Sequence, residues 1–221
     1  MSPDPTQETP RPPETAEFGL VKVGGPPHDY APEGSLHVRK LAVGPYENNV
    51  FAIVSGAEAI VVDGADESEW ILELVDGLAV TAIVETHNHA DHVQALPALV
   101  EALGAPVYAH PDDPPGVPFT PLVEGDRLRV EGDEITVLHT PGHTPGSLCF
   151  AARGFLFSGD TLFPGGPGKT GDPERFARIM TSLDRLFATF PDATRVCPGH
   201  GIDTTIGRER PYVETWRARG W

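Results

Sequence analysis

The pattern of hydrophobic and polar positions along the chain predicts strands and helices in a definite order. Short runs rich in β-branched and apolar residues, separated by Gly, Pro and Asn, predict strands. Longer stretches with apolar residues at helical spacing predict helices. The expected strands are residues 36–43, 50–55, 59–63, 80–85, 106–109, 127–131, 135–138, 148–151, 155–158 and 194–197, and the expected helices are residues 66–77, 93–103, 173–190 and 206–217.

This order of elements predicts an α/β protein with two packed sheets. A β-α-β unit falls in the N-terminal half, and strands alone follow from residue 127. Strand-rich halves with helices outside favour a four-layer αββα sandwich. We expect residues 18–221 to form a single domain, because this length suits one α/β core. Residues 1–17 are rich in Pro and poor in apolar residues, which predicts a flexible leader.

Composition and charge limit the kinds of partner that we expect for this chain. The chain has 32 acidic and 16 basic residues, a formal net charge of −16, which disfavours nucleic acid as a partner but says nothing about the substrate. We expect a small-molecule substrate. No apolar run approaches the ~20 residues that cross a bilayer, and no signal sequence begins the chain, so we expect a cytoplasmic protein without membrane contact. Cys149 and Cys197 form no C-x-x-C motif and are expected to be buried thiols. The oligomeric state stays open.

The candidate chemistry begins directly after the strand expected at residues 80–85. The segment Thr-His-Asn-His-Ala-Asp-His places four metal-ligand side chains within six residues, at His87, His89, Asp91 and His92. In extended chain His87 and His89 project to the same side, and a turn into the next helix can direct the other two toward a second point. One segment can therefore serve two adjacent metal ions.

Three later segments each offer one further ligand in a glycine-containing loop after a strand. They are Pro-Gly-His at His143, Ser-Gly-Asp at Asp160 and Pro-Gly-His at His200. Glycine allows close backbone approach, so loops at one edge of a sandwich can converge on a common point. Isolated histidines are more often structural, and we interpret the remaining four in this way: His28, His37, His110 and His139.

These motifs together resemble those of the metallo-β-lactamase superfamily, whose H-x-H-x-D-H motif stands here at residues 87–92. The resemblance extends from about residue 36 to residue 200. It implies a first metal held by His87, His89 and His143, and a second held by Asp91, His92 and His200. It also implies that Asp160 bridges the two metals.

Two divalent ions are therefore the expected cofactors. Imidazole and carboxylate suit zinc, which we favour, but also iron or manganese, because no thiolate stands at a ligand position. Two such ions about 3.5–4 Å apart can hold a bridging hydroxide and polarise a carbonyl, so that no serine or cysteine nucleophile is needed. Asp91 is the expected catalytic residue.

Within the superfamily, the residues after Asp160 are similar to those of glyoxalase II. The segment Gly-Gly-Pro-Gly-Lys places Lys169 where that family keeps a basic residue for the carboxylate end of its thiol carrier. A solvated surface lysine is the alternative. Two departures leave the carrier open: only 21 residues follow His200, and no aromatic residue follows Lys169 closely. Mycothiol in place of glutathione is one hypothesis.

The leading function is thus the hydrolysis of a thioester. The first alternative is a mononuclear iron persulfide dioxygenase that uses His87, His143 and an Asp160-type ligand. A lactonase of the same fold is another, and the absence of a cysteine ligand disfavours β-lactam hydrolysis. Asp63, at the end of an early strand, is expected either to orient a ligand histidine or simply to form an Asp-Gly turn.

Overall fold

The computed structural model describes residues 11–33 and 36–220. Its first sheet has seven strands, which lie in the order in which they follow along the chain. They are β1 (His28–Glu33), β2 (Leu36–Val43), β3 (Asn48–Ser55), β4 (Glu58–Val62), β5 (Ala79–Val84), β6 (Val107–Ala109) and β7 (Thr120–Pro121). The meander from β1 to β4 is antiparallel, and β4 to β7 are parallel to one another.

The second sheet has six strands in the order β15-β14-β11-β10-β9-β8. Along the chain they are β8 (Arg127–Val130), β9 (Asp133–His139), β10 (Leu148–Ala152), β11 (Phe155–Gly159), β14 (Arg195–Pro198) and β15 (Thr204–Thr205). A short hairpin, β12 (Leu162–Phe163) and β13 (Gly166–Pro167), follows β11. In this sheet β11 and β14 are parallel neighbours, although some 40 residues separate them in the sequence.

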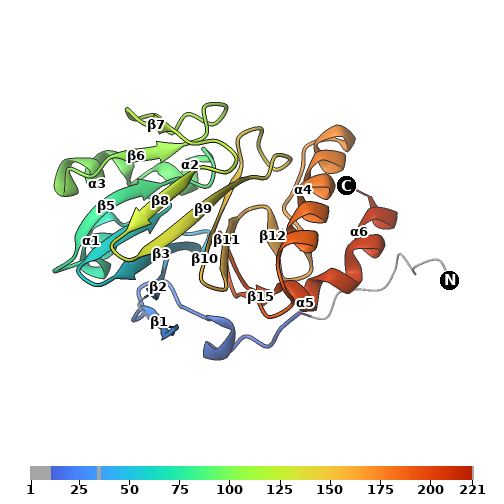
Figure 1. The fold of residues 1–221 in the computed structure, drawn as a ribbon, viewed down its shortest axis with the longest axis horizontal. Helices are drawn as coiled ribbons and strands as arrows, with labels where there is room; N and C mark the ends of the chain where they lie inside the picture. Colours follow the sequence, from blue (N-terminus) through green and yellow to red (C-terminus); the bar gives the residue numbers. More distant parts are fainter. Residues whose placement is uncertain (1–10, 34–35, 221) are drawn as a thin grey trace.

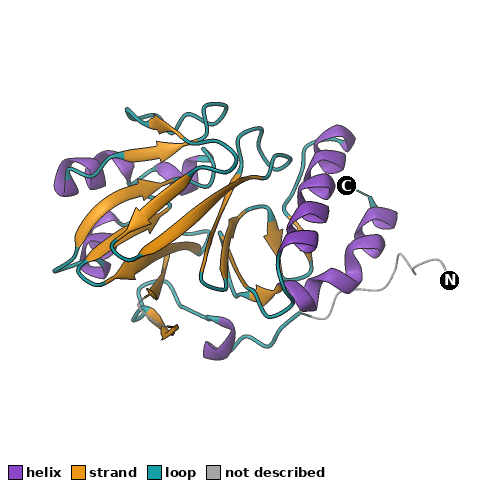
Figure 2. Cartoon of the chain, viewed as in Figure 1, coloured by secondary structure: helices purple, strands orange, loops and turns teal. Residues whose placement is uncertain are grey.

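Helices cover the outer faces of both sheets, so the fold is the expected four-layer αββα sandwich (Figure 1, Figure 2). The helices over the first sheet are α1 (Ser68–Leu74), α2 (Ala90–Val93) and α3 (Leu96–Leu103), and those over the second are α4 (Pro173–Thr189), α5 (Ile206–Glu209) and α6 (Val213–Arg219). In the described residues, no helix is both long and apolar enough to span a bilayer.

The layers arise from strands that bury both faces. All eight residues of β3 are buried. Phe51 and Ile53 pack into the core between the sheets, whereas Val50, Ala52 and Val54 pack under α1 and α3. Because side chains alternate along a strand, an unbroken apolar run of this kind serves two cores at once.

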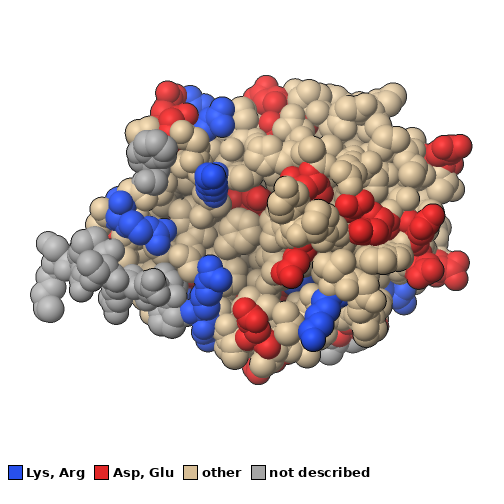
Figure 3. Space-filling model, turned by 180° about the vertical axis from the view of Figure 1, so that it is seen from behind, with Lys and Arg blue, Asp and Glu red and all other residues tan. Residues whose placement is uncertain are grey.

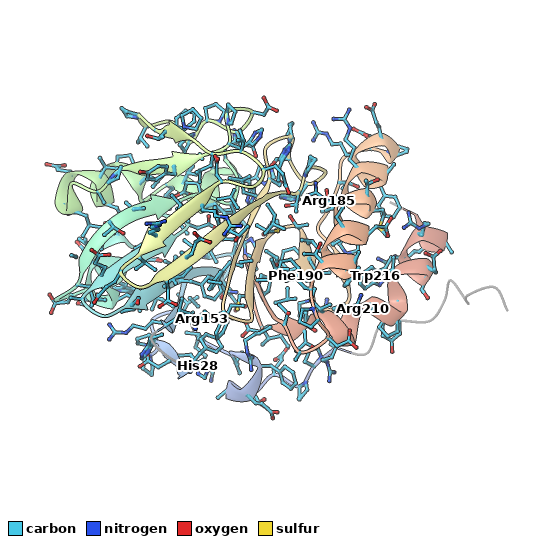
Figure 4. All side chains as sticks on the ribbon, viewed as in Figure 1. His28, Arg153, Arg185, Phe190, Arg210 and Trp216 are labelled. Carbon is cyan, nitrogen blue, oxygen red and sulfur yellow. The ribbon has the colours of Figure 1, made fainter. Side chains whose placement is uncertain are left out.

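The C-terminal layer follows the predicted helical pattern with one correction. Asp172 caps α4, accepting a hydrogen bond from the Arg175 amide at 2.8 Å, and Pro173 opens the helix. The single helix expected at residues 206–217 is instead divided into α5, a 3-10 turn at Arg210–Tyr212 and α6. Pro211 explains the break, because it lacks the N–H that a continuous helix needs. Trp216 is fully buried beside α4 (Figure 4).

Two other sequence expectations need comment. The helix expected at residues 93–103 is two helices, because α2 begins three residues earlier and carries Asp91 and His92, and α3 begins anew with Pro97 in its first turn. Residues 1–10 of the expected leader lie outside the described residues. Its described part, 11–17, runs into a short 3-10 helix, where the Glu17 carbonyl accepts a hydrogen bond from Arg195 at 3.0 Å.

Candidate metal centre

The ligand segment leaves the end of β5 in extended form and then enters α2. The Nε2 atom of His87 and the Nδ1 atom of His89 lie 3.1 Å apart, so the two rings face one point, as the alternation predicts. The turn is closed by a hydrogen bond of 2.9 Å from the His92 amide to the His89 carbonyl. This turn directs Asp91 and His92, on α2, toward a second point.

The second sheet supplies the other three candidate ligands from loops at one edge. His143 follows β9, Asp160 follows β11 and His200 follows β14. The parallel pairing of β11 and β14 brings two of these loops together, and the Gly199 amide donates to the Gly159 carbonyl at 2.8 Å.

Two glycines make the close approach of these loops possible. A Cβ atom on Gly199 would stand 2.4 Å from Oδ1 of Asp160 and 2.8 Å from the His92 ring. A Cβ atom on Gly159, which has a φ of 46°, would stand 2.6 Å from the Thr86 side chain. Both positions therefore require glycine for the loops to meet the ligand segment.

The structure brings all seven predicted ligands together in two adjoining groups. In the first, Nε2 of His143 lies 3.0 Å from Nδ1 of His89, next to His87. In the second, Nε2 of His92 lies 3.1 Å from Nε2 of His200, and both lie within 3.7 Å of Oδ2 of Asp91.

Asp160 stands between the two groups, with one carboxylate oxygen turned to each. Its Oδ2 atom lies 3.4 Å from Nε2 of His143. Its Oδ1 atom lies 3.6 Å from Nε2 of both His92 and His200. This is the placement that a bridging carboxylate requires.

Hydrogen bonds on the outer side fix the tautomers of four histidines. The Nδ1 atoms of His92, His143 and His200 face acceptors on Asp63, the Lys169 carbonyl and the Tyr46 carbonyl at 2.9, 2.7 and 2.9 Å. Nδ1 of His87 faces the Thr86 hydroxyl at 3.1 Å, and that hydroxyl donates to Asp63.

Each of these rings thus donates its Nδ1 proton outward, which leaves the Nε2 lone pair turned inward. Such outward partners are characteristic of metal-ligating histidines.

The electrostatics of the centre favour the binding of a cation. Burial lowers the pKa of His87 well below its usual value, which keeps that ring neutral. Burial alone would raise the pKa of Asp160, but the neighbouring His200 and His92 rings hold it well below the usual range. Asp160 is therefore a carboxylate, and its buried Oδ1 atom has no hydrogen-bond partner.

The donor set fits divalent metal ions. Inward lone pairs and an unpartnered carboxylate oxygen would repel one another without a positive charge between them. Donor atoms that bind one zinc ion at about 2.0–2.1 Å in a tetrahedron lie about 3.4 Å apart. The contacts described above, from 3.0 to 3.7 Å, match that spacing. His87, His89 and His143 would hold one ion, Asp91, His92 and His200 the other, and Asp160 both.

The supporting residues lie partly where the sequence predicts them. Asp63 accepts hydrogen bonds from the Thr86 amide at 2.7 Å and the Thr86 hydroxyl at 2.9 Å, in addition to its contact with His92. Asp63 therefore fixes the orientation of the His92 ring, which is one of the candidate ligands. Lys169 lines a cavity of about 740 Å³ together with Asp91 and His200. No carboxylate of a described residue forms an ion pair with its ammonium group.

Sequence reasoning did not predict the start of β3 as part of the centre. The Asn48 side chain donates to Oδ2 of Asp91 at 2.9 Å, and Asn48 also forms a β-bridge with His200. The Asn49 side chain donates to the carbonyls of Pro198 and Gly201 at 2.8 and 2.9 Å. Amide side chains next to a glycine and a proline are typical of any turn, so only the tertiary structure reveals this role.

The histidines that we interpreted as structural lie apart from the centre. His110 and His139 stack on each other with ring centroids 4.1 Å apart, and His37 contacts Asp29 at 3.2 Å near the surface. His28 packs edge-on against Tyr30 in the first sheet.

Comparison with known proteins identifies the family that this fold and site define. The family model for the metallo-beta-lactamase superfamily matches residues 43–116 and 110–200, which together span the whole ligand set. The chain belongs to this superfamily.

Three proteins illustrate which members of the superfamily the chain is similar to. A hydroxyacylglutathione hydrolase of Xylella fastidiosa is 39% identical over 160 residues, covering 70% of this chain and 60% of the relative. The crystal structure of TTHA1623 in a di-iron-bound form is 38% identical, with a TM-score of 0.67 over 77% of this chain and 96% of that one. ETHE1 from Myxococcus xanthus is 31% identical, with a TM-score of 0.72 over 78% and 81%. The chain thus spans somewhat less than two thirds of the hydroxyacylglutathione hydrolase.

Proposed function

We propose that this protein is a binuclear metallohydrolase that cleaves thioesters of a small thiol carrier. The observation that supports it most is the set of imidazole nitrogens that face Asp160 from both sides, next to a cavity that Asp91 and His200 line. The similarity to a hydroxyacylglutathione hydrolase favours a thioester over other acyl substrates.

The metal ions would supply the main chemistry. Two divalent cations held by these residues would polarise a carbonyl and lower the pKa of a bound water molecule. We favour zinc because the donors are imidazole and carboxylate in tetrahedral reach, with iron as the alternative that the di-iron form of TTHA1623 keeps open.

The protein's own residues would position the substrate and move a proton. Burial tends to raise the pKa of Asp91, but the hydrogen bond from Asn48 and the nearby His92 keep it below its usual value. Asp91 is therefore a carboxylate at the cavity wall, and we assign it the role of proton acceptor during attack by water. The ammonium group of Lys169, which has no ion-pair partner in the described part of the chain, would bind a carboxylate of the carrier on the same side.

The proposed substrate is a small molecule, and we place the protein in the cytoplasm. A nucleic-acid partner would require a continuous basic surface. On the face shown in Figure 3, Lys and Arg side chains form separate small patches and no continuous stripe. The formal net charge of −16 agrees with this proposal.

Metal analysis of the purified protein, combined with an activity panel, tests the proposal. The panel contains S-acyl thiols, lactones and persulfides, with oxygen consumption followed in parallel. We expect two metal ions per chain and thioester hydrolysis without oxygen uptake. One iron per chain with persulfide-dependent oxygen uptake would instead establish the dioxygenase alternative, and turnover of lactones alone would establish the lactonase.

A further inference from the structure

A lysine lies fully buried in the core between the two sheets. Lys40 follows Leu36 and Val38 on the same face of β2, and those two side chains pack between the sheets. The Lys40 side chain has no exposed surface, and its ammonium group lies 5.7 Å from the centre of the Phe51 ring on β3. A charge at such a position is costly unless it is paired and hydrogen-bonded. The partners of this lysine must therefore compensate its charge.

The ammonium group of Lys40 pairs with two groups of one loop. We call residues 199–203, between β14 and β15, the His200 loop. Lys40 forms an ion pair with Oδ1 of Asp203 at 2.9 Å, and it donates to the Gly201 carbonyl at 2.7 Å. Asp203 is fully buried as well. Both partners thus lie within three residues of the candidate ligand His200.

The start of β3 holds the same loop from its other side. The Gly201 carbonyl accepts a second hydrogen bond, from the Asn49 side chain at 2.9 Å, so both of its lone pairs are used. The Asn49 side chain also donates to the Pro198 carbonyl at 2.8 Å, and the Asn49 amide donates to the Gly199 carbonyl at 2.7 Å. The backbone on both sides of His200 is therefore fixed relative to β2 and β3.

The direction of the His200 ring depends on this backbone. Nδ1 of the ring faces the Tyr46 carbonyl at 2.9 Å, and Nε2 lies 3.1 Å from Nε2 of His92 in the second ligand group. Metal ligands must stay within about 0.5 Å of their productive positions. Because His200 belongs to the second group only, a shifted loop would weaken the second metal site and spare the first.

Stability and attraction for the metal are both poor explanations of this buried pair. Apolar residues of similar volume often replace a buried ion pair with no loss of stability. The cluster is also not arranged to attract a cation. Oδ2 of Asp203 accepts from the Tyr30 hydroxyl at 2.6 Å and from Arg195 at 3.3 Å, so two cations, Lys40 and Arg195, face one carboxylate. Placement of the loop is the role that these contacts support.

We propose that Lys40 and Asp203 are positioning residues, which hold His200 in place and thereby set the affinity of the second metal site. The inference rests on the two-metal centre of the proposed function and is independent of the substrate. Both residues would act through the His200 loop and not as ligands. A chain without this pair would keep its first metal and would fill the second site only at higher metal concentration.

A second buried aspartate provides a matched control. Like Asp203, Asp133 accepts hydrogen bonds from one hydroxyl, that of Ser55 at 2.8 Å, and from one guanidinium, that of Arg153. Asp133 is the first residue of β9, whereas the loop that carries His143 follows the last residue of that strand. Asp133→Asn therefore breaks a comparable buried network at the end of the sheet away from the centre.

Zinc titration of the metal-free protein by calorimetry tests the proposal. His200→Ala identifies the binding step of the second ion, because it removes a ligand of that site alone. Lys40→Met and Asp203→Asn should weaken the same step about 10- to 100-fold and leave the first step unchanged. Asp133→Asn should lower the melting temperature and leave both steps unchanged.

Lys40→Met is the decisive variant, for two reasons. It should fold, because Asp203 keeps Arg195 as a partner and no buried charge is left unpaired. It also removes a positive charge one residue from His200 in contact, so an electrostatic effect alone would tighten zinc binding, whereas a loss of position weakens it.

The titration needs no substrate, so it separates this inference from the proposed function. Two zinc ions with a selectively weakened second step, but no thioester hydrolysis, would establish the positioning role while the proposed function fails. A second step that is unchanged or tighter in Lys40→Met overturns the inference, as does an equal loss at both steps or the same selective loss in Asp133→Asn. A wild-type protein that binds a single zinc ion would end both proposals.

Discussion

The metal centre and the wall of the cavity that contains Asp91 and Lys169 are built in opposite ways. In the centre, His87 and His92 are buried, and four rings are fixed by outward hydrogen bonds. In the wall, Tyr46 exposes a large part of its side chain, and Lys169 has no ion-pair partner among the described residues. Folding alone therefore fixes the geometry of the centre, whereas we expect a few exposed side chains of the wall to determine selectivity.

Removal of one ligand should have the largest effect. His89→Ala deletes the Nδ1 atom that lies 3.1 Å from His87 and 3.0 Å from His143. His89 is the most exposed of the seven, so the fold should survive. We expect loss of bound metal and a fall in kcat/KM of about a thousandfold or more, equivalent to roughly 4 kcal/mol.

Metal content and circular dichroism, measured on the same sample, check this prediction. His37→Ala is the control, because His37 is a partly exposed histidine of β2 far from the centre. A His89→Ala protein with full metal content and wild-type turnover would show that the seven residues do not form the catalytic centre.

Substitution of an orienting residue should have a smaller effect. Asp63 accepts hydrogen bonds from Thr86 and His92 through both of its oxygens. It has a φ of 64°, a conformation that asparagine also tolerates, so Asp63→Asn changes one acceptor and not the backbone. An amide nitrogen in place of Oδ1 loses the contact with the Thr86 amide, and one in place of Oδ2 loses the contacts with the Thr86 hydroxyl and the His92 ring. Metal affinity or kcat/KM should fall about 10- to 100-fold.

Zinc titration of the metal-free protein is the direct measurement. Asp76→Asn, on the exposed turn after α1, is the matched control. If Asp63→Asn bound zinc as tightly as the wild type, Asp63 would be only a turn-forming residue, which was the second interpretation of its Asp-Gly sequence.

The sequence predicted the centre well because its signals are local. Alternation placed His87 and His89 on one side, and glycine marked the loops that carry Asp160 and His200. The strands with the strongest β patterns appear in the structure with their predicted ends, as at β2, or with small shifts, as at β3, which begins two residues earlier than predicted.

The contacts around the centre could not be predicted, because they join distant parts of the chain. Asp203 reaches Phe18 across the sequence, and Asn48 reaches Asp91. Lys40 is another example: its strand, Leu-His-Val-Arg-Lys-Leu-Ala-Val, gives no sign that this lysine is fully buried while Arg39 is not. Local periodicity carries no information about such pairings.

The smallest predicted effect concerns Lys169, whose side chain belongs to the cavity wall while its backbone belongs to the centre. Its carbonyl accepts a hydrogen bond from Nδ1 of His143 at 2.7 Å, so Lys169→Ala removes the ammonium group and leaves that contact in place.

The S-acetyl thioesters of N-acetylcysteine and N-acetylcysteamine differ only by a carboxylate. For the first, KM should rise about tenfold with kcat unchanged, and the rise should shrink at high salt, because an exposed charge pair is screened. The second should show no change, and Lys169→Arg should restore the wild-type KM for the first. An equal loss for both thioesters would mean that Lys169 supports the centre, and the division between a fixed centre and selective walls would then fail at this residue.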